Sequence, residues 1–520
     1  MPPIDAAPST DRSQAGTLAF LGDPRSHGGR PVERVDTHAA VVFLAGGRAY
    51  KLKRAVRYPY LDYSTVEKRE AACRAELAIN RRTAPTLYRD VLAIRRRPDG
   101  GLFLDEAGDG ARSGPAVDWV VAMRRFPADA LFDRMAERGA LTPAIMRALA
   151  GRVAAFHAAA EVRRDGGGEA ALRAVVDGNI AEMAESPALF PPERLGRLAA
   201  RSAAALDRLK PLLERRRRDG FVRRCHGDLH LRNILLLDGV LTLFDAIEFD
   251  ETLAVTDLLY DLAFLLMDLE RRGLRPLGNA LLNRWLDETG DRAGLAALPL
   301  FLSVRAAVRA KIAAVAAALS AGKAEELAAE ARRGFDQAVA ALEPPPPRLV
   351  AVGGLSGTGK SLLAHALAPA LGPAPGAVIL RSDALRKRMR GVPETERLPP
   401  DAYDPATTAR VYAALLDGAR TVLEAGHAVV VDAVCARPEE RAALESLAAA
   451  ASVRFDGIWL DAALELRAAR VTNRRNDASD ATAEVAKRQE SYDLGDIRWA
   501  RLDSGRVAAD VLADARATLA

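Results

Sequence analysis

The chain has 520 residues, of which 49% are hydrophobic and 28% are charged. This composition excludes a disordered chain, and the length exceeds what one hydrophobic core serves, so we expect roughly three folding units. The 74 Lys and Arg residues against 69 Asp and Glu residues leave a net charge of +5, which does not by itself indicate a nucleic-acid-binding protein. Cys73, Cys225 and Cys435 lie far apart with no CxxC pair, which argues against a disulfide framework or a structural zinc site.

The N-terminal stretch MPPIDAAPSTDRSQAG is polar and rich in proline, and we expect residues 1–16 to be disordered. It lacks the basic-then-apolar pattern of a signal peptide. No apolar run reaches the roughly 18 residues that a membrane span needs. The sequence therefore predicts a cytoplasmic enzyme with no membrane partner.

Residues 17–342 predict one domain with two lobes. In the small lobe, residues 17–120, the segment HAAVVFLAGGRAYKLKR indicates two strands joined by a Gly-Gly turn. A helix over residues 64–84 follows and begins with a Ser-x-x-Glu capping box. Residues 126–342 are mostly helical and form the large lobe.

Four consecutive prolines in LEPPPPRLV mark the clearest domain boundary. Such a run cannot continue a helix and favours a stiff, extended spacer. We therefore place a linker at residues 343–348 and a second domain at residues 349–520.

A polar loop, CHGDLHLRN, precedes the apolar run ILLL within residues 225–237, and the next strand, LTLFD, ends in Asp245. Phosphoryl transfer needs a carboxylate to accept the proton of the attacking hydroxyl, and oxygen ligands for Mg²⁺ on the nucleotide phosphates. We expect Asp228 to be that base and Asn233 and Asp245 to be the metal ligands. The alternative, that these are turn and strand-cap residues, is disfavoured by their kinase-like spacing. His226 is expected to brace the loop.

A kinase site of this kind also needs a lysine for the phosphates and a helical glutamate to hold it. RAYKLKR offers Lys51 and Lys53 on one face of a strand. We prefer Lys51, which follows a small residue and an aromatic one, and leave Lys53 as the alternative. Glu76 of the following helix is the preferred partner, with Glu70 second.

The motif HGDLHLRN, with LFD downstream, resembles the aminoglycoside phosphotransferase and choline kinase-like branch of the protein-kinase fold. The likeness covers residues 30–340 and implies an ATP-dependent phosphotransferase. The sequence departs from that pattern where a glycine-rich loop is expected, because VDTHAAVVF stands there instead. Thr37 and His38 are candidates to cover the nucleotide phosphates in its place.

A second nucleotide motif opens the C-terminal domain, where the strand RLVAV leads through a glycine-rich loop into a helix. Backbone N–H groups of such a loop, with a helix N-terminus behind them, cradle phosphates. The lysine is expected to reach the β- and γ-phosphates, and the last serine hydroxyl to bind Mg²⁺. The nucleotide-binding residues expected here are Gly354, Leu355, Ser356, Gly357, Thr358, Gly359, Lys360 and Ser361.

Further strands alternate with helices after this loop, which predicts a parallel sheet. One strand ends at Arg381-Ser382-Asp383, another ends at Asp432, and RFDGIWLD forms a third. Asp432 is either a ligand of the nucleotide's metal or a strand-end cap.

This arrangement resembles the P-loop kinases that phosphorylate hydroxyl groups, of the polynucleotide kinase, zeta-toxin and gluconate kinase types. The resemblance implies that Asp383 orients the acceptor hydroxyl and that lid arginines, Arg470 and Arg474, neutralise the γ-phosphate. These two belong to a group of four arginines that precedes the polar segment NDASD, with Arg467 and Arg475. The alternative is that the arginine group is a solvated helix face.

Together the two halves resemble a bacterial family in which an aminoglycoside phosphotransferase-like domain is fused to a P-loop ATP-binding domain. The fold implied is an α+β bilobal kinase-like domain followed by an α/β P-loop domain with a parallel sheet. Two ATP sites are implied, with ATP and Mg²⁺ as cofactors.

Three functional hypotheses follow. In the first, both sites phosphorylate hydroxyl groups of small-molecule metabolites, because no acidic cluster suited to a polycationic drug stands out in the large lobe. In the second, the C-terminal domain is a polynucleotide 5′-hydroxyl kinase. In the third, one domain is a regulatory ATP-binding module. The second hypothesis would be supported by a basic channel from Arg381, Arg386, Lys387, Arg388 and Arg390.

Overall fold

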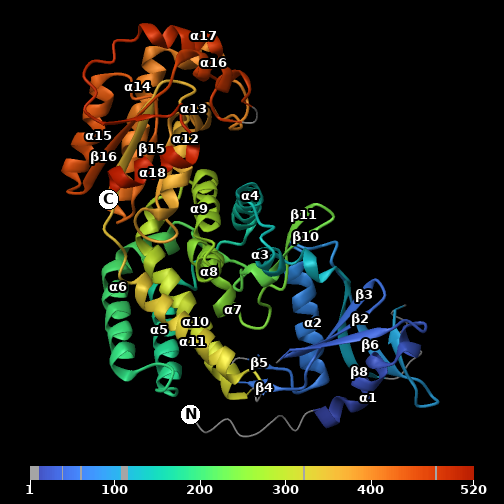
Figure 1. The fold of residues 1–520 in the computed structure, drawn as a ribbon. Coiled ribbons are helices and arrows are strands. Elements are labelled where there is room, and N and C mark those ends of the chain that lie inside the picture. The colour runs from blue at the N-terminus through green and yellow to red at the C-terminus, as the bar shows by residue number, and fades with distance from the viewer. Residues whose placement is uncertain (1–10, 38, 59–60, 107–114, 320–321, 475–476) are drawn as a thin grey trace. The chain divides into compact units, whose positions relative to one another are not determined.

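The computed structural model describes residues 11–37, 39–58, 61–106, 115–319, 322–474 and 477–520 (Figure 1). His38 and Arg475, two residues singled out in the sequence, lie outside the described residues. The chain forms two compact units, each built from several segments. The first comprises Met1–Leu141, Ala155–Ala171 and Glu214–Leu265, and the second comprises Thr142–Ala154, Leu172–Leu213 and Leu266–Ala520.

An antiparallel sheet of order β1-β2-β3-β8-β6-β7 forms the small lobe of the first unit. Its strands are β1 (Val32–Asp36), β2 (Ala40–Ala45), β3 (Arg48–Lys53), β6 (Tyr88–Arg96), β7 (Leu102–Asp105) and β8 (Ala116–Arg124). The β2–β3 hairpin turns at the predicted Gly-Gly pair, where Gly46 has a φ of 57°. Because successive side chains of a strand face opposite sides, Val120 and Val121 pack in different hydrophobic clusters.

Helices α1 (Asp11–Gly22) and α2 (Val66–Asn80) pack in these two clusters. Leu21 of α1 lies with Val120, whereas Cys73 of α2 lies with Val121. The sheet is therefore covered on both faces, and α2 brings its buried carboxylate, Glu76, against the strand that carries the two lysines.

The terminus expected to be disordered through residue 16 is helical from Asp11 onward. The buried side chain of Gln14 anchors the helix: it donates to the Lys53 carbonyl (3.0 Å) and to Asp118 (2.8 Å) and accepts from the Ala55 N–H (2.8 Å). These bonds join residues far apart in the chain, so no local sequence pattern predicts them. The polar composition of the segment by itself indicated disorder.

The helix expected over residues 64–84 is shorter at both ends. Its N-cap is Thr65, whose hydroxyl accepts from the Lys68 N–H, and not Ser64 of the expected capping box. Ser64 instead bonds to Asp62. Ser and Thr both cap helix N-termini, so the path by which the chain enters the helix decides between neighbouring candidates.

Short strand pairs frame the polar loop that carries Asp228. The expected pair, β10 (Ile234–Leu237) with β11 (Val240–Leu243), follows the loop. A second pair, β9 (Val222–Arg224) with β12 (Val255–Asp257), is only three residues long and was not predicted. Other elements with residues in this unit are η1 (Pro24–His27), β4 (Arg57–Tyr58), β5 (Leu61–Asp62), η2 (Ala128–Ala130), α3 (Phe132–Glu137), η3 (Leu231–Asn233) and α7 (Glu251–Ala254).

Helices dominate the middle of the chain. Those that contribute residues to both units are α4 (Pro143–Ala159), α5 (Gly168–Ala184), α6 (Pro192–Arg218) and α8 (Leu258–Arg271). The second unit continues with α9 (Arg275–Thr289), η4 (Ala293–Ala297), α10 (Leu298–Leu319) and α11 (Ala324–Ala341). α10 and α11 pack closely at Gly334. A Cβ at this position would lie only 3.2 Å from the Ala310 backbone. The proline segment follows α11.

A five-stranded parallel sheet of order β14-β15-β13-β16-β17 forms the C-terminal part of the second unit. Its strands are β13 (Arg348–Gly354), β14 (Val378–Arg381), β15 (Val429–Asp432), β16 (Arg454–Asp461) and β17 (Ala500–Asp503). Its helices are α12 (Lys360–Leu367), η5 (Ala368–Ala370), α13 (Ser382–Met389), η6 (Pro400–Tyr403), α14 (Pro405–Glu424), α15 (Pro438–Ala450), α16 (Leu464–Thr472), α17 (Ala483–Arg488), η7 (Gln489–Ser491) and α18 (Ala508–Leu519).

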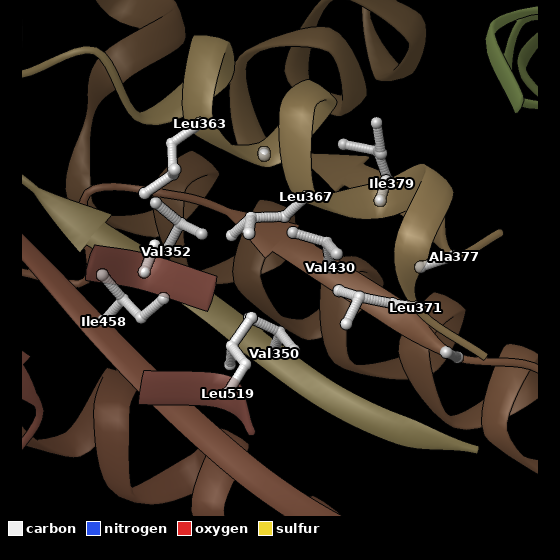
Figure 2. Close-up of a cluster of buried hydrophobic side chains, with 14 of the residues drawn as sticks. Val350, Val352, Leu363, Leu367, Leu371, Ala377, Ile379, Val430, Ile458 and Leu519 are labelled. Atoms are coloured by element: carbon white, nitrogen blue, oxygen red, sulfur yellow. The ribbon is translucent and has the colours of Figure 1, made fainter. Parts of the chain in front are cut away.

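Figure 2 shows the apolar cluster on one face of this sheet. Val352 and Ile458 of neighbouring strands lie with Leu363 of α12 and Leu519 of α18. Residues that alternate with them, such as Leu349, are buried as well, so both faces are covered, as is usual in parallel sheets. The predicted α/β fold is confirmed, and the carboxyl ends of the strands are where its ligand site is expected.

Among the described residues, no helix is both long and apolar enough to cross a bilayer. Cys73, Cys225 and Cys435, all within the described residues, are buried and are not joined in a disulfide.

Candidate active sites

Lys51 of β3 is the centre of an ion-pair cluster in the first unit. Its Nζ lies 2.8 Å from Glu76 Oε1 and 2.6 Å from Asp245 Oδ1. Lys53, on the same strand face, lies 2.6 Å from the other oxygen of Glu76. Glu70, the second choice of partner, pairs with an arginine on its own helix instead. The structure thus brings the preferred lysine, the preferred glutamate and the strand-end aspartate together.

Electrostatics keeps this buried cluster ionised. Burial would raise the pKa of Glu76, but the charges of Lys51 and Lys53 outweigh it and lower that pKa to about 2. Burial also opposes the charge of Lys51, yet the carboxylates of Asp245 and Glu76 hold the pKa of Lys51 well above its usual value. A lysine fixed in its charged form is suited to binding phosphate oxygens.

Asp245 is held by contacts that the sequence did not indicate. Its backbone is left-handed, with a φ of 60°, and its N–H donates to the Tyr88 hydroxyl (3.3 Å). The next N–H, of Ala246, donates to the buried side chain of Asn80 (2.8 Å), whose amide donates to the Glu76 carbonyl (3.0 Å). Asn80, the last residue of α2, therefore joins the helix that carries the glutamate to the strand end that carries the aspartate.

The loop before β10 places Asp228 and Asn233 in direct contact. The Asn233 amide donates to the Asp228 carboxylate and to its carbonyl, both at 2.9 Å. His230 Nε2 lies 3.4 Å from the same carboxylate. The Asp228 side chain is 37% exposed, which leaves it accessible to an acceptor.

Asp261 of α8 holds this loop through hydrogen bonds, a role that the sequence did not predict. Its carboxylate accepts from the Gly227 N–H (2.8 Å), from the His226 N–H (3.3 Å) and from His157 Nε2 (3.1 Å). His226 bonds through Nε2 to the Phe244 carbonyl (2.9 Å), so it braces the loop against the next strand. Burial lowers the pKa of His226, which keeps the ring neutral.

Thr37 stabilises the β1–β2 turn. Its hydroxyl donates to the Ala40 carbonyl (2.9 Å) and accepts from the Ala40 N–H (3.0 Å). This use of the side chain within its own turn is the common role of threonine at such positions. Nothing in these contacts directs the hydroxyl toward a nucleotide.

The loop between β13 and α12 requires glycine at particular positions. A Cβ at Gly354, where φ is 137°, would lie 2.6 Å from the Leu460 carbonyl oxygen. A Cβ at Gly357, where φ is 87°, would lie 2.5 Å from the Arg467 carbonyl oxygen. Only glycine fits so close to another backbone in a left-handed conformation. The loop is therefore packed tightly against the backbone of β16 and α16.

Side chains of this loop converge on the end of β15. The Ser361 hydroxyl donates to Asp432 at 2.6 Å, so the two residues expected to hold the metal lie together. Lys360 Nζ donates to the Leu355 carbonyl (3.1 Å), and burial lowers the pKa of this lysine. Thr358 is buried and donates to the same carbonyl (2.9 Å).

One loop amide is already engaged by a residue that the sequence did not single out. The Ser356 N–H donates to the side chain of Gln489 at 2.8 Å. Gln489 lies in η7, 133 residues further along the chain, so local patterns could not connect the two.

Asp383 lies in the first turn of α13, directly after β14. It is partly buried, and desolvation raises the pKa of its carboxyl group. The nearby Ser479 side chain acts on that pKa in the opposite direction. A carboxyl group with a raised pKa is a better proton acceptor than an exposed aspartate.

The described arginines of the predicted lid differ from one another. Arg467 is buried and pairs with Glu490, so the solvated-face alternative does not hold for it. Arg470 donates to the Ser504 carbonyl (2.8 Å), and Arg474 lies 3.2 Å from Asp477. Both line a cavity of about 740 Å³ beside the glycine-rich loop, a volume typical of small-molecule sites. Its walls include Gly357, Gly359, Leu466, Leu512, Arg470 and Arg474.

Two family models match the chain. Residues 71–298 match the phosphotransferase enzyme family, and residues 349–492 match a model described as an AAA domain. The resemblance found in the sequence is confirmed, and the chain is a phosphotransferase enzyme with a kinase-like domain followed by a P-loop kinase domain.

Solved structures resemble each half separately. A gluconokinase from Sinorhizobium meliloti 1021 is 24% identical and covers 34% of this chain and 91% of its own, with a TM-score of 0.24. A choline/ethanolamine kinase family protein from Mesorhizobium loti is 15% identical and covers 64% of this chain and 99% of its own, with a TM-score of 0.38. Both TM-scores are below 0.5, so the assignment rests on the family models.

Relatives match across both halves. The "Uncharacterized protein Rv2004c" of Mycobacterium tuberculosis (strain ATCC 25618 / H37Rv) is 33% identical over 472 residues, which cover 88% of this chain and 90% of the relative. The "Uncharacterized protein Mb2027c" of Mycobacterium bovis matches to the same extent. With a third of the residues identical over nearly the full length of both chains, this protein belongs to the same family as Rv2004c and Mb2027c.

Proposed function

We propose that each nucleotide site transfers the γ-phosphate of ATP to a hydroxyl group of a small-molecule metabolite. The observation that carries the proposal is the contact of Lys51 with both Glu76 (2.8 Å) and Asp245 (2.6 Å). A lysine held between a helical carboxylate and a strand-end aspartate is the arrangement that phosphoryl transfer in a kinase-like lobe requires.

At the first site, Asp228 accepts the proton of the acceptor hydroxyl as its oxygen attacks the γ-phosphorus. The bond from that phosphorus to the bridging oxygen breaks, and ADP leaves. The Asn233 amide orients the base through its 2.9 Å bond to the carboxylate. Because that bond uses the amide nitrogen, the amide oxygen is left for a metal.

Mg²⁺ suits the oxygen ligands that both sites offer. Asn233 and Asp245 would hold it at the first site, and Ser361 and Asp432, 2.6 Å apart, at the second. When bound, Mg²⁺ offsets the negative charge of the phosphates.

At the second site, the backbone amides of the glycine-rich loop and Lys360 bind the phosphates. Asp383, whose pKa is raised by burial, accepts the proton of the acceptor hydroxyl. Arg470 and Arg474 line the cavity beside the loop, where the rest of the nucleotide fits.

The alternative of a polynucleotide 5′-hydroxyl kinase depends on the basic run in α13 and next to it. Arg381, Lys387, Arg388 and Arg390 each form an ion pair with a carboxylate of the chain. Arg386 donates to a backbone carbonyl. Cations that are already paired attract a phosphate backbone less strongly, which favours a small acceptor. A purely regulatory module has no need for a base such as Asp383.

The test is transfer of labelled γ-phosphate from ATP to sugars, amino alcohols, aminoglycosides and 5′-hydroxyl oligonucleotides. We expect Asp228→Asn to lower transfer to one group of acceptors by about 10²–10⁴-fold, since a general base is lost. Asp383→Asn is expected to do the same for a different group, and Lys360→Ala to abolish nucleotide binding at the second site. The matched control is Asp417→Asn, at an exposed carboxylate of α14.

The outcomes separate the hypotheses. Unchanged transfer to every acceptor in Asp228→Asn would remove the base assignment at the first site. Loss of oligonucleotide phosphorylation alone in Asp383→Asn would establish the polynucleotide alternative. A variant that alters the rate at the other site, without losing any acceptor of its own, would identify a regulatory module.

A further inference from the structure

The segment that follows α16 reaches the proposed acceptor site of the P-loop domain. Two of its carboxylates contact β14 and α13: Asp477 accepts from Arg381 (2.7 Å) and Asp480 accepts from Lys387 (2.9 Å). Ser479 lies between them in the chain, and its hydroxyl is near enough to Asp383 to lower the pKa of that carboxyl group. The segment therefore brings a hydroxyl and, from the next residue, a carboxylate to the helix that carries the proposed base.

Asp480 occupies an anion-binding site formed by three hydrogen-bond donors. Its carboxylate accepts from the Lys387 ammonium (2.9 Å), from the Leu398 N–H (3.0 Å) and from the Tyr403 hydroxyl (2.6 Å). The ammonium, the amide and the phenol come from α13, the loop after it and η6, so three separate elements converge on one anionic group. Convergent donors of this kind bind carboxylates and phosphates.

Because Lys387 is buried, leaving this anion site empty would destabilise the folded protein. The side chain of Lys387 is 1% exposed and that of Asp480 is 10% exposed. A buried ammonium is strongly destabilising unless an anion pairs with it. Lys387 also lies four residues after Asp383 on α13, and residues four apart in a helix share one face. The anion site therefore lies on the same face of α13 as the proposed base.

We propose that Ser479 and Asp480 fill the acceptor site as an internal stand-in for the acceptor. Ser479 takes the place of the acceptor hydroxyl, and Asp480 takes the place of an anionic group close to that hydroxyl. The acceptor of this domain is then a small hydroxylated metabolite with a carboxylate or a phosphate monoester, and it enters by displacing the segment. This inference rests on the proposed role of Asp383 as the base.

The test is calorimetric binding of three matched probes to the full chain: glycerol, glycerate and glycerol 3-phosphate. In Asp480→Asn the competing carboxylate is gone, so we expect the anionic probes to bind about tenfold more tightly than to wild type, the worth of one charged hydrogen bond. The affinity for glycerol should be the same in Asp480→Asn as in wild type. A gain confined to glycerate or to glycerol 3-phosphate identifies which anion the site prefers.

Three further variants serve as controls. The double variant Lys387→Gln/Asp480→Asn removes both charges and should lose the gain, whereas Asp417→Asn should match wild type. If Asp480→Asn does not fold, Ser479→Ala, which keeps the ion pair, should show a smaller gain.

Equal affinity in wild type and in the folded variants would overturn the proposal, as would a gain that persists in the double variant. The binding measurement needs no transfer. Failure of the Asp383 assignment would instead appear as unchanged transfer in Asp383→Asn, so the two failures are distinguishable.

Discussion

At the scale of single residues, the two lysines of β3 illustrate how neighbours acquire different roles. Both contact Glu76, but only Lys51 also contacts Asp245. Lys53 is buried, pairs with Glu248 and lies 5.0 Å from the Tyr63 ring centre. Their spacing in the sequence is compatible with either choice, and the packing of α2 and of the strand end distinguishes them.

We therefore predict opposite effects for two substitutions. Lys51→Met should abolish most transfer at the first site with little loss of stability, because Glu76 keeps Lys53 as a partner. Lys53→Met should destabilise the protein by about 3–5 kcal/mol, because the nearly buried carboxylate of Glu248 loses its lysine partner, whereas Asp245, the carboxylate that only Lys51 contacts, is partly exposed. Labelled transfer and urea unfolding measure the two effects. Equal loss of stability in both variants would contradict the division of roles.

His427 makes a prediction about pH. It is fully buried at the start of β15, and burial lowers the pKa of its ring to about 4. In the unfolded chain the ring has a pKa near ~6.5, so the unfolded state binds more protons. The contribution of the neutral His427 ring to the free energy of unfolding is fully present above the unfolded-state pKa. It is lost as the pH drops toward about 4, which lowers the free energy of unfolding by about 3 kcal/mol.

His427→Phe should remove most of this pH dependence. The measurement is the free energy of unfolding in urea at pH 7 and pH 5 for wild type and variant. His365→Gln is the control, because His365 is exposed on α12. If the slope of stability with pH is the same in all three proteins, the buried imidazole does not titrate as described.

At the scale of elements, helices position loops that carry the chemistry. Asp261 of α8 accepts the N–H groups of His226 and Gly227, just before the proposed base. Gly227 has a φ of 82°, and a Cβ there would lie 3.0 Å from Ile247. The loop is thus held by a helix on one side and packed against the chain after β11 on the other.

Asp261→Asn should disturb this support with little change in volume. An amide offers one acceptor oxygen where the carboxylate offers two, so one backbone N–H loses its partner. We expect the turnover rate at the first site to fall by about 10–100-fold while the KM for ATP stays nearly constant. A misplaced base slows the chemical step but does not contact the nucleotide, so ATP binding should be preserved. A rise in the KM for ATP without a change in turnover would show that the helix supports the nucleotide instead.

Elements also mark where sequence patterns were insufficient. The strand β3, the helix α2 and the loop–helix pair at Lys360 were expected, because periodicity and glycine spacing are local signals. α1 was missed, since its first turns are polar and are anchored by a buried glutamine, while its apolar contacts come from its last residues. β9 and β12 were missed because strands of three residues carry too little pattern.

At the scale of the molecule, the proposed sites lie in different compact units. Lys51, Glu76, Asp228 and Asp245 belong to the first, and the glycine-rich loop with Asp383 belongs to the second. Each unit contains its own proposed phosphate-binding lysine and its own proposed base.

Independence of the two sites is therefore the prediction for the whole chain. In the double variant Asp228→Asn/Lys360→Ala, each reaction should fall by the same factor as in its single variant, since distant sites with no shared partners add. Steady-state rates with one acceptor for each site measure this. A loss at either site greater than in its single variant would reveal coupling between the units.

The sequence by itself determined the parts whose chemistry is local. The glycine-rich loop with Lys360, and the pair Asp228 and Asn233, lie within a few residues of one another, so spacing alone implies their geometry. Tertiary structure decided the rest. Lys51 meets Asp245 across 194 residues, and Lys387 meets Asp480 across 93. Such contacts depend on how sheets and helices pack, and a single sequence does not encode that packing in any local pattern.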